Sequence, residues 1–528
     1  MEPSGGPSGT SSSALPGGHD ATAEEGAIRP ATVVPTTLGS LAARIADATG
    51  TAPELQGADV TTTGATLRAH EARPGDLFAA LPGARAHGAD FADQALAGGA
   101  VAVLTDPDGA TRPVVRTLPT LVHPEPREAL GPACSRLYGD PSSHLALLGV
   151  TGTSGKTTTV YLLEAALAAA GTTTGLIGTV ETRMHGRRVP SAFTTPEAPD
   201  LQALLAAMLE QGVTHAAMEV SSHALAQGRV GGTRYAVGAF TNLSAEHLDF
   251  HPTMEDYFAA KARLFDGRAD RHVVCVDDAW GARLAGTVEA TTVSTTGPAD
   301  WTAAEVVAHP DGSQSFRVHG PDGLALPVTL RLPGAFNVAN ALVALACGHA
   351  VGLDPERLAA GLATVTVPGR MQRVEAGQPY LAVVDYAHKP AAVEALLRTL
   401  RTQTEGRVLT VLGCGGDRDR EKRPVMGALA AQLSDLVWIT DDNPRTEDPA
   451  AIRAAMLDGA QGADGARAIV AEEGDRRAAI RAAVAAACPG DVVVVAGKGH
   501  ELGQKVGAQT LPFSDVDELT TAIQEDPA

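Results

Sequence analysis

One stretch constrains the fold of this chain more than any other. It is an apolar run at residues 145–150 that leads through a Gly- and Thr-rich turn into a helical pattern at 158–170. The same order returns later, with strands predicted at 381–385, 408–412, 436–440 and 491–496, and helices at 391–401, 425–433 and 450–458. Alternating strands and helices indicate parallel sheets with binding sites at the carboxyl ends of the strands. The sequence therefore predicts an α/β fold.

The chain of 528 residues is long enough for several domains, each with its own core. A loop-forming stretch at 138–143 and a Pro-Gly pair at 368–369 mark two boundaries. The first 35 residues are mostly Gly, Ser, Pro, Thr and Ala, which offer little apolar surface to bury. We therefore predict a disordered tail over residues 1–35 and three α/β domains over residues 36–142, 143–367 and 368–528.

Composition excludes several classes of partner. The formal net charge is −20, whereas a nucleic-acid groove shows itself as a basic patch, so no nucleic acid is expected. The longest apolar runs have the length of a strand, and the N-terminus lacks the pattern of a signal peptide, so we expect no membrane segment. Five scattered cysteines without a CxxC spacing fit a reducing cytoplasm.

The turn after residues 145–150 reads Thr-Gly-Thr-Ser-Gly-Lys-Thr-Thr. Its glycines let backbone N–H groups curl around phosphate oxygens, and the following helix adds a favourable dipole. The lysine would reach the β- and γ-phosphates, and the next threonine would bind Mg²⁺. Val150 stands where the general pattern has its first glycine, so the loop is a variant; the alternative is a Gly-rich turn with a solvated lysine. The predicted ATP-binding residues here are Gly152, Thr153, Ser154, Gly155, Lys156, Thr157 and Thr158.

Two further segments suggest a metal near that loop. Glu219 ends a predicted strand at 214–220, and His247 lies in a polar segment at 242–251 that follows another strand. A carboxylate and an imidazole beside a phosphate loop could hold a second Mg²⁺, although Mg²⁺ prefers oxygen ligands. Each residue alone is more often structural; the two together favour the functional interpretation.

A series of motifs then points to a family. TGTSGKTTT, MEVSSHAL, TNLSAEHLDFHPTMEDYFAAKARLF, GAFNVANALVA, DYAHKPAAVEALL, DDNPRTEDP and GKGHE occur in this order. The series resembles the Mur ligases, specifically the branch that adds the third peptide residue of peptidoglycan precursors. The resemblance implies a small UDP-binding α/β domain, a central P-loop ATPase-type domain with a parallel sheet, and a C-terminal Rossmann-like α/β domain. It also implies ATP-dependent amide formation through an acyl phosphate.

The resemblance assigns the reaction centre and the nucleotide site. Catalytic roles go to Lys156, Glu219, His247 and Lys261, with Lys261 as an N-carbamate; Thr157, Glu219, His247 and the carbamate are the implied metal ligands. The alternative for Lys261 is a cation on a helix surface. Around ATP the resemblance adds Asn337, Arg370, Asp385 and His388, although Asn337 could be a helix cap and Arg370 a surface cation.

The two other substrates are assigned in the same way. The implied residues for UDP-MurNAc-dipeptide are Leu67, Thr194, Thr195, Ser221, Gln227 and Arg229. One departure follows Leu67, where Arg68-Ala69-His70 replaces the usual Asp-Ser-Arg. The implied residues for diaminopimelate are Arg418, Asp442, Asn443, Pro444, Arg445, Gly497 and Glu501. Arg445 can clamp a carboxylate with two hydrogen bonds, which favours diaminopimelate over lysine.

The leading hypothesis is thus a cytoplasmic, monomeric ligase that uses ATP and Mg²⁺ to join diaminopimelate to the UDP-muramoyl dipeptide. A folylpolyglutamate synthetase is a rival that the Asp442–Arg445 tetrapeptide disfavours. A paralogue with a changed donor stays open because of Arg68-Ala69-His70. A non-catalytic ATP-binding scaffold is a third alternative, and the joint presence of Lys156, Glu219, His247 and Lys261 argues against it.

Overall fold

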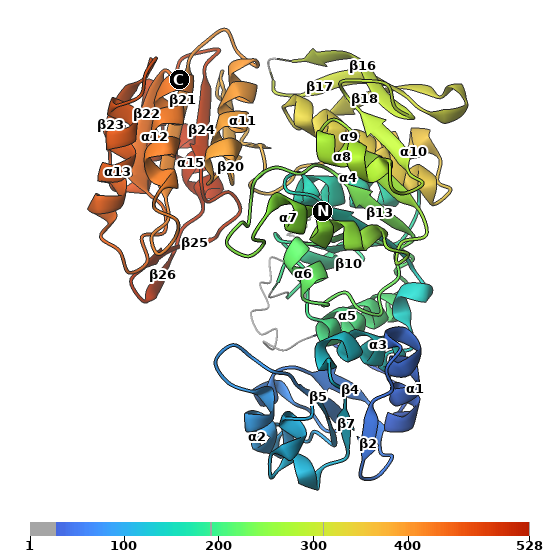
Figure 1. Cartoon of the computed structure of the whole chain (residues 1–528). Coiled ribbons are helices and arrows are strands. Elements are labelled where there is room, and N and C mark those ends of the chain that lie inside the picture. Colours follow the sequence, from blue (N-terminus) through green and yellow to red (C-terminus); the bar gives the residue numbers. More distant parts are fainter. Residues whose placement is uncertain (1–27, 191–192, 310, 527–528) are drawn as a thin grey trace, which may run out of the picture.

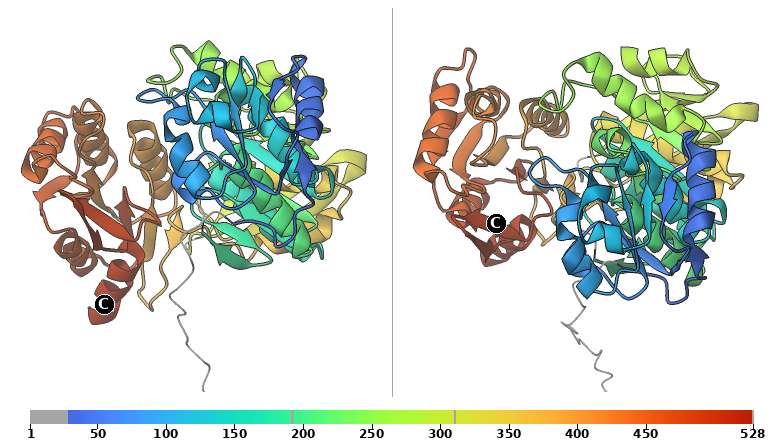
Figure 2. Two further views of the ribbon diagram at one scale, coloured as in Figure 1. Left: turned by 90° about the horizontal axis from the view of Figure 1, so that it is seen from below. Right: turned by 60° about the horizontal axis from the view of Figure 1, so that its bottom comes forward.

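The computed structural model describes residues 28–190, 193–309 and 311–526. Three lobes follow the chain, the N-terminal one at the bottom of Figure 1, the central one above it, and the C-terminal one beside the central lobe (Figures 1 and 2). The lobes hold separate sheets, as the predicted three α/β domains require. Within the described residues no helix has the length and apolar character needed to cross a membrane.

The N-terminal domain is built on a five-stranded sheet. Its order is β2 (Glu54–Gln56), β7 (Thr120–Val122), β6 (Ala102–Thr105), β5 (Asp76–Ala80) and β4 (Gly64–Thr66), with only β2 antiparallel to its neighbour. Helix α1 (Leu38–Thr49) begins where Thr37 accepts a hydrogen bond from the N–H of Ser40. It packs against α3 (Pro126–Leu137) through Leu38, Leu41 and Ile45.

The predicted N-terminal tail needs a correction at its end. Residues 1–27 lie outside the described part of the chain, but residues 28–35 lie against the folded domains. Arg29 is ion-paired with the fully buried Asp76, and its Nη2 donates to that carboxylate at 2.8 Å. The N–H groups of Ala31 and Thr32 donate to the carboxylate of Glu210. Composition could not reveal these distant partners.

The central domain contains an eleven-stranded sheet. Its parallel core runs β9 (Thr174–Ile177), β12 (His215–Glu219), β8 (Ala146–Thr151), β13 (Val237–Phe240), β14 (His272–Cys275), β15 (Thr291–Ser294) and β16 (Trp301–Ala308). Antiparallel strands extend both edges, β10 (Thr182–Met184) and β11 (Arg187–Val189) at one and β17 (Gln314–His319) and β18 (Ala325–Leu330) at the other. The strand–helix alternation predicted the core and not these edges.

Helices cover the two faces of the central sheet. On one face α4 (Lys156–Ala169), α9 (Ala335–Ala350) and α10 (Pro355–Leu362) enclose a single apolar cluster. On the other face α5 (Ala198–Glu210) and α7 (Met254–Ala262) pack over the strands. Strands β8, β12 and β13 are neighbours, so the residues that follow their carboxyl ends meet at one edge. This edge holds the phosphate loop and Glu219.

The C-terminal domain has a six-stranded sheet. The order is β19 (Gln372–Arg373), β20 (Leu381–Asp385), β24 (Val492–Ala496), β21 (Val408–Cys414), β22 (Leu436–Asp441) and β23 (Ile469–Glu472), parallel except for β19. Helices α11 (Pro390–Arg401), α12 (Lys422–Leu433) and α13 (Pro449–Gln461) confirm the three predicted helices. Helices α14 (Arg476–Ala486) and α15 (Asp515–Glu525) and a hairpin of β25 (Gly503–Val506) and β26 (Gln509–Pro512) complete the domain.

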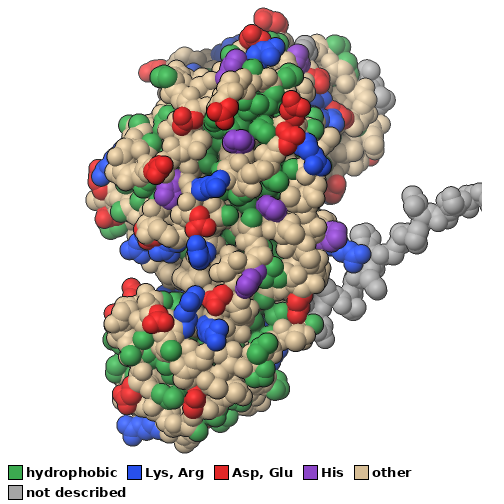
Figure 3. Space-filling model, turned by 90° about the vertical axis from the view of Figure 1, so that its right-hand side faces the viewer, with side chains coloured by type: hydrophobic (Ala, Val, Ile, Leu, Met, Phe, Trp, Pro, Cys, Tyr) green, Lys and Arg blue, Asp and Glu red, His purple; other side chains and the backbone are tan. Residues whose placement is uncertain are grey.

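Several ion pairs join neighbouring lobes, Arg127–Glu197, Arg331–Glu375 and Arg373–Asp311 among them. Between the N-terminal and central domains, Arg68 donates two hydrogen bonds to Asp200 of α5, at 2.8 and 3.0 Å. Between the central and C-terminal domains, Lys389 at the start of α11 pairs with Glu246. The molecule narrows between the lowest lobe and the rest in Figure 3, and acidic and basic side chains are interspersed over that face.

Candidate active site

The phosphate loop has the backbone geometry that its sequence predicts. Gly152 and Gly155 have φ values of +148° and +88°, in the region that favours glycine. A Cβ on Gly152 would lie 1.9 Å from Oγ1 of Thr241, so no larger residue fits there. Asn242 fixes the loop from the side, because its Oδ1 accepts from the N–H of Ser154 at 2.9 Å. The loop is therefore held open in a defined shape.

Glu219 ends β12 beside this loop and is 1% exposed. Its carboxylate accepts from the Thr157 hydroxyl at 3.1 Å and from the N–H and hydroxyl of Thr179 at 2.8 and 3.1 Å. The structure thus brings the predicted metal ligands Thr157 and Glu219 together. A buried carboxylate that accepts these hydrogen bonds from neutral groups is a strong attractor for a cation.

Two lysines meet on the other side of the loop. Lys156 and Lys261 both donate to the carbonyl of Gly152, at 2.9 and 2.7 Å. Lys261 is 1% exposed and its Nζ lies 4.5 Å from the ring centre of Tyr257. Burial, reinforced by the charge of Lys156, lowers the pKa of Lys261 well below that of a free lysine. The environment therefore favours a neutral amine there, contrary to the alternative of a surface cation.

His247 lies in a group of rings beside these lysines. Its ring centre is 4.7 Å from that of His223 and 6.1 Å from that of Tyr257. Burial, then the charges of Lys156 and Lys261, lower the pKa of His247, which keeps the imidazole neutral and able to accept a metal. His247 has φ of +56°, an uncommon backbone for a residue other than glycine.

Thr157 and Glu219 could bind Mg²⁺ together with the oxygens of a bound phosphate. Across the described residues, no cluster of three or more His, Cys, Asp and Glu side chains is placed to hold a metal by itself. Mg²⁺ is usually bound by one or two carboxylates, with phosphate oxygens and waters completing the shell. The Thr157 hydroxyl and the Glu219 carboxylate supply protein oxygens of that kind. A carbamate on Lys261 would add another.

The predicted nucleotide residues of the C-terminal domain gather around Tyr386. The guanidinium of Arg370 stacks 4.3 Å from the centre of that ring, and the ring of His388 lies 4.6 Å away. Asp385 ends β20 and accepts backbone bonds from Met371 at 2.7 Å and Ala387 at 2.8 Å. Burial raises the pKa of Asp385 and Tyr386 and lowers that of His388. Lys389 next to them forms the interdomain pair with Glu246.

Asn337, the remaining residue predicted at ATP, lies at the start of α9. It is 1% exposed in the first turn of α9, where its Nδ2 donates to the carbonyl of Pro333 at 2.7 Å and its Oδ1 accepts from Asn340 at 3.0 Å. Neither bond caps a backbone N–H group, and the N-cap of α9 is Gly334, without a side-chain cap, so these contacts do not match the helix-cap alternative; the role at adenine stays a prediction. Asn340 contacts the phosphate loop instead, because its Oδ1 lies 2.4 Å from where a Cβ on Gly155 would stand.

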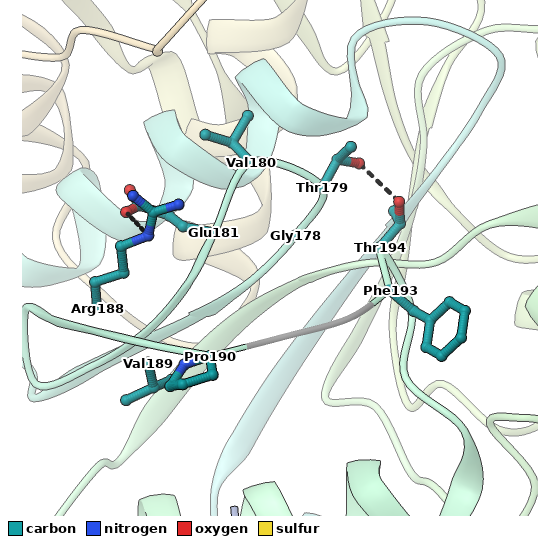
Figure 4. A pocket seen from close by; sticks show the side chains of 9 residues that line it. All are labelled: Gly178, Thr179, Val180, Glu181, Arg188, Val189, Pro190, Phe193 and Thr194. Atoms are coloured by element: carbon teal, nitrogen blue, oxygen red, sulfur yellow. Dashed lines mark hydrogen bonds and ion pairs between the residues drawn. The ribbon is translucent and has the colours of Figure 1, made fainter. Parts of the chain in front are cut away.

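A cavity of about 410 Å³ opens next to Glu219, lined by residues 178–181, 188–190, 193 and 194. Figure 4 shows Thr179 and Thr194 facing each other on one side, with their hydroxyls 3.0 Å apart. Arg188 and Glu181 pair on the other side, at 3.7 Å. The cavity thus combines hydroxyls with an exposed guanidinium, next to the predicted phosphoryl-transfer site.

The other predicted donor residues continue from this cavity. Thr195 is buried, donates to the carbonyl of Glu219 at 2.9 Å, and accepts from the N–H of Ser221 at 3.1 Å. Ser221 caps the short helix α6 (Ser222–Ala226), which Gln227 ends. Arg229 pairs with Glu197 at 3.0 Å. Leu67 lies in the N-terminal domain, packed at the edge of its core.

The predicted diaminopimelate residues lie where β22 and β24 end. Asp442 and Asn443 are buried, and Glu501 accepts from Nδ2 of Asn443 at 2.8 Å. The Nη1 of Arg445 donates to the carbonyl of Gly416 at 2.6 Å, and Gly497 has φ of +116° beside Asp442. Pro444 is buried between them. Arg418 lies on an exposed turn, where its Nη1 donates to the carbonyl of Asp417 at 3.3 Å.

Comparison with known proteins now decides the family. The Mur ligase family catalytic domain matches residues 61–137, the Mur ligase middle domain 150–348, and the Mur ligase glutamate ligase domain 369–499. The UDP-N-acetylmuramoyl-L-alanyl-D-glutamate--2,6-diaminopimelate ligase of Corynebacterium efficiens is 54% identical over 92% of this chain and 94% of its own length. This chain belongs to the Mur ligase family.

Two further relatives agree with that membership. The ligase of the same name from Streptomyces avermitilis is 52% identical over 94% of this chain and 98% of its own length. A solved structure described by that name is 34% identical, with a TM-score of 0.66, and the match covers 89% of this chain and 97% of that one. The Mur ligase fold therefore extends over nearly the whole described chain.

Several residues of this Mur ligase site escaped the sequence analysis. Thr179, Asn340 and Tyr386 all contact predicted residues; Thr179 lies outside the motifs, whereas Asn340 and Tyr386 lie inside GAFNVANALVA and DYAHKPAAVEALL without an assigned role. Lys498 stands inside GKGHE and is fully buried. Burial of a lysine is a structural signal that a single sequence does not give, so only its place in this motif and the scarcity of lysine, six in the chain, could have drawn attention to it.

Proposed function

We propose that this Mur ligase uses ATP to join diaminopimelate to UDP-N-acetylmuramoyl-L-alanyl-D-glutamate, with Mg²⁺ as cofactor. The relatives at 52–54% identity bear the name of this ligase over almost their full length. We further propose that it acts as a monomer in the cytoplasm, which fits its five free cysteines, four of them buried.

The observation that carries this proposal is the charge pattern around Asn443. The carboxylates of Asp442 and Glu501 lie within reach of an ammonium, and Arg445 follows in the same tetrapeptide. Within the described chain, Oδ1 of Asp442 is buried without a hydrogen-bond partner. Its nearest cation in the described chain is the ammonium of Lys498, at 3.7 Å, so the atom keeps the capacity to accept a hydrogen bond. The distal head of diaminopimelate carries an ammonium and a carboxylate, and so matches both signs of charge.

Acyl-phosphate formation would take place at the phosphate loop. The N–H groups of the loop and Lys156 would hold the γ-phosphoryl group while the donor carboxylate attacks phosphorus in line, the bond to the β-phosphate oxygen breaks and ADP leaves. The Thr157 hydroxyl and the Glu219 carboxylate would hold Mg²⁺, whose chemistry when bound would be to offset negative charge on the transferred group. The Thr179, Thr194 and Thr195 hydroxyls would orient the donor, since they surround the cavity and the Glu219 backbone.

Amide formation would follow in the closed site. The amino group of diaminopimelate attacks the acyl carbon, a tetrahedral intermediate forms, and phosphate leaves with one oxygen of the former carboxylate. This step draws on both lobes, because the amino-acid pocket lies in the C-terminal domain and the phosphate loop in the central one, and Lys389 and Glu246 already join the two.

The test is a pair of parallel assays with ATP, Mg²⁺ and the UDP-muramoyl dipeptide. One receives diaminopimelate and the other receives lysine, and both are followed by phosphate release and product mass. We expect product and phosphate with diaminopimelate and little of either with lysine. Absence of a diaminopimelate-dependent product would refute the proposal.

A further inference from the structure

Lys498 has no role in the reaction described so far, yet it is the most deeply buried lysine of the described chain. Its side chain is 0% exposed, in the turn that follows β24. A lysine is almost never fully buried unless it is paired, because its ammonium loses hydration. Its partners therefore indicate what it does.

The partners are the predicted amino-acid ligands themselves. Nζ of Lys498 donates to Oδ1 of Asn443 at 3.1 Å and to Oε2 of Glu501 at 3.1 Å. It also lies 3.7 Å from Oδ1 of Asp442, the oxygen without a hydrogen-bond partner among described residues. One buried amine thus stands behind three side chains of the pocket.

The Asn443 amide is fixed on every side as a result. Its Oδ1 also accepts from the N–H of Lys505 at 2.9 Å, and its Nδ2 donates to Glu501 at 2.8 Å. Lys505 lies in the β25–β26 hairpin, and its carbonyl also accepts from the N–H of Arg445 at 3.0 Å. The φ of Arg445 is +53°. The side chains that would contact the distal head of diaminopimelate are therefore linked by hydrogen bonds into one rigid group.

Charge gives Lys498 a second effect. Burial alone would raise the pKa of Glu501, but the hydrogen bond from Asn443 and the charge of Lys498 lower it, so Glu501 is an anion. With Asp442, the pocket holds two carboxylates against Arg445 and Lys498. Without Lys498, the net charge of these pocket side chains becomes negative. A negative pocket disfavours a ligand carboxylate and favours a bare ammonium such as the side chain of lysine.

We propose that Lys498 is a positioning residue that sets the preference for a zwitterionic distal head over a bare ammonium. It acts through Asn443, Glu501 and Asp442 and does not touch the reacting atoms. The inference rests on the proposed function, since it concerns the choice of amino acid at the same pocket.

The experiment compares the full-length wild type with Lys498→Met, which keeps the length of the side chain and removes its charge. Lys498→Gln is a second variant that keeps a hydrogen-bond donor. The matched control is Lys505→Met, because Lys505 has an exposed side chain and contributes only its backbone, which the substitution retains. For each protein, kcat and KM are measured with diaminopimelate and lysine, together with KM for ATP and the melting temperature.

We expect Lys498→Met to raise KM for diaminopimelate about 10- to 100-fold, the range for losing a charged hydrogen bond, with KM for ATP within about twofold. The preference for diaminopimelate over lysine in kcat/KM should fall by about tenfold or more, and less in Lys498→Gln. Lys505→Met should match the wild type.

Three results would overturn the proposal, because each would make Lys498 purely structural. The first is an unchanged preference for diaminopimelate over lysine in a folded Lys498→Met enzyme. The others are an equal loss of affinity for both amino acids and ATP, or unfolding of both Lys498 variants. Failure of the proposed function is distinguishable, because then the wild type itself would form no diaminopimelate-dependent product.

Discussion

Lys156 and Lys261 donate to the same carbonyl, that of Gly152, within a buried region. Two ammonium groups on one acceptor repel each other, and burial increases the repulsion because it lowers the local dielectric. The depressed pKa of Lys261 relieves this conflict by favouring the neutral amine. A neutral amine reacts with carbon dioxide, and the resulting carbamate would turn the repulsion into attraction for both Lys156 and Mg²⁺.

At this scale Lys261→Ala should lower kcat by at least about 100-fold, since a positioned anion in the site is lost. Short carboxylic acids should restore part of the activity by occupying the vacated space. Lys261→Arg serves as the control, because it fills the space but cannot be carbamylated, and it should show no rescue. Full activity of Lys261→Ala without added acid would contradict the carbamate.

Arg445 offers a second residue-level prediction. Arg445→Ala should raise KM for diaminopimelate about 10- to 100-fold and leave KM for ATP unchanged, because the guanidinium is expected to clamp the distal carboxylate. Arg445→Lys keeps the charge and loses the two-pronged geometry, so it should recover only part of the affinity. Steady-state kinetics with each substrate varied in turn measures this, and an unchanged KM for diaminopimelate would refute the clamp.

At the scale of elements, α14 and α15 are joined by three ion pairs, Arg476–Asp515, Arg477–Glu518 and Arg481–Glu525, of which the first and the last differ most in exposure. Arg476 and Asp515 are both 0% exposed and share two hydrogen bonds of 2.7 Å. Arg481 and Glu525 join the same two helices with both side chains about half exposed, at 2.8 Å. Removing one partner of a buried pair strands a charge, whereas an exposed pair contributes little.

Asp515→Ala should therefore lower the free energy of unfolding of the C-terminal domain by about 3–5 kcal/mol. Glu525→Ala is the matched control and should change it by less than about 1 kcal/mol. Urea unfolding followed by Trp438 fluorescence reports on the domain, because Trp438 lies in β22 of that sheet. Equal effects of the two substitutions would contradict the assignment of the buried pair.

Elements also differ in how well the sequence predicts them. The strand at 381–385 and the helix at 391–401 are apolar enough for their period to show, and the structure confirms both. Strand β23 is exposed along most of its length, so its pattern carries no signal of burial. Motif spacing located the phosphate loop and Glu219, but the setting of Lys498 depends on contacts with Asn443 across 55 residues. Local pattern does not contain such contacts.

At the scale of the whole molecule, Arg68 links two lobes. Arg68 departs from the Asp-Ser-Arg pattern, and its partner Asp200 lies 132 residues away, which no local pattern could reveal. The pair joins the N-terminal domain, which carries Leu67, to helix α5 of the central domain. Asp200 lies three residues after Glu197, which is the ion-pair partner of Arg229. The departure therefore places an interdomain ion pair beside the predicted donor site.

Arg68→Ala and Asp200→Ala should each raise KM for the UDP-muramoyl dipeptide by about three- to tenfold, with KM for diaminopimelate unchanged. The double variant should be no worse than either single one, because one interaction is lost in all three. The effect should shrink at high salt, since the pair is partly exposed. Additive losses in the double variant would contradict a direct link between the two residues.

The central claim is that this chain activates the donor carboxylate as an acyl phosphate for attack by diaminopimelate. The most direct measurement uses the UDP-muramoyl dipeptide with ¹⁸O in its terminal carboxylate, together with ATP, Mg²⁺ and diaminopimelate, and determines the masses of product and phosphate. The account predicts a tripeptide product that retains one labelled oxygen at the new amide, and inorganic phosphate that carries the other. Unlabelled phosphate, or label transfer that is coupled to lysine and not to diaminopimelate, would contradict it.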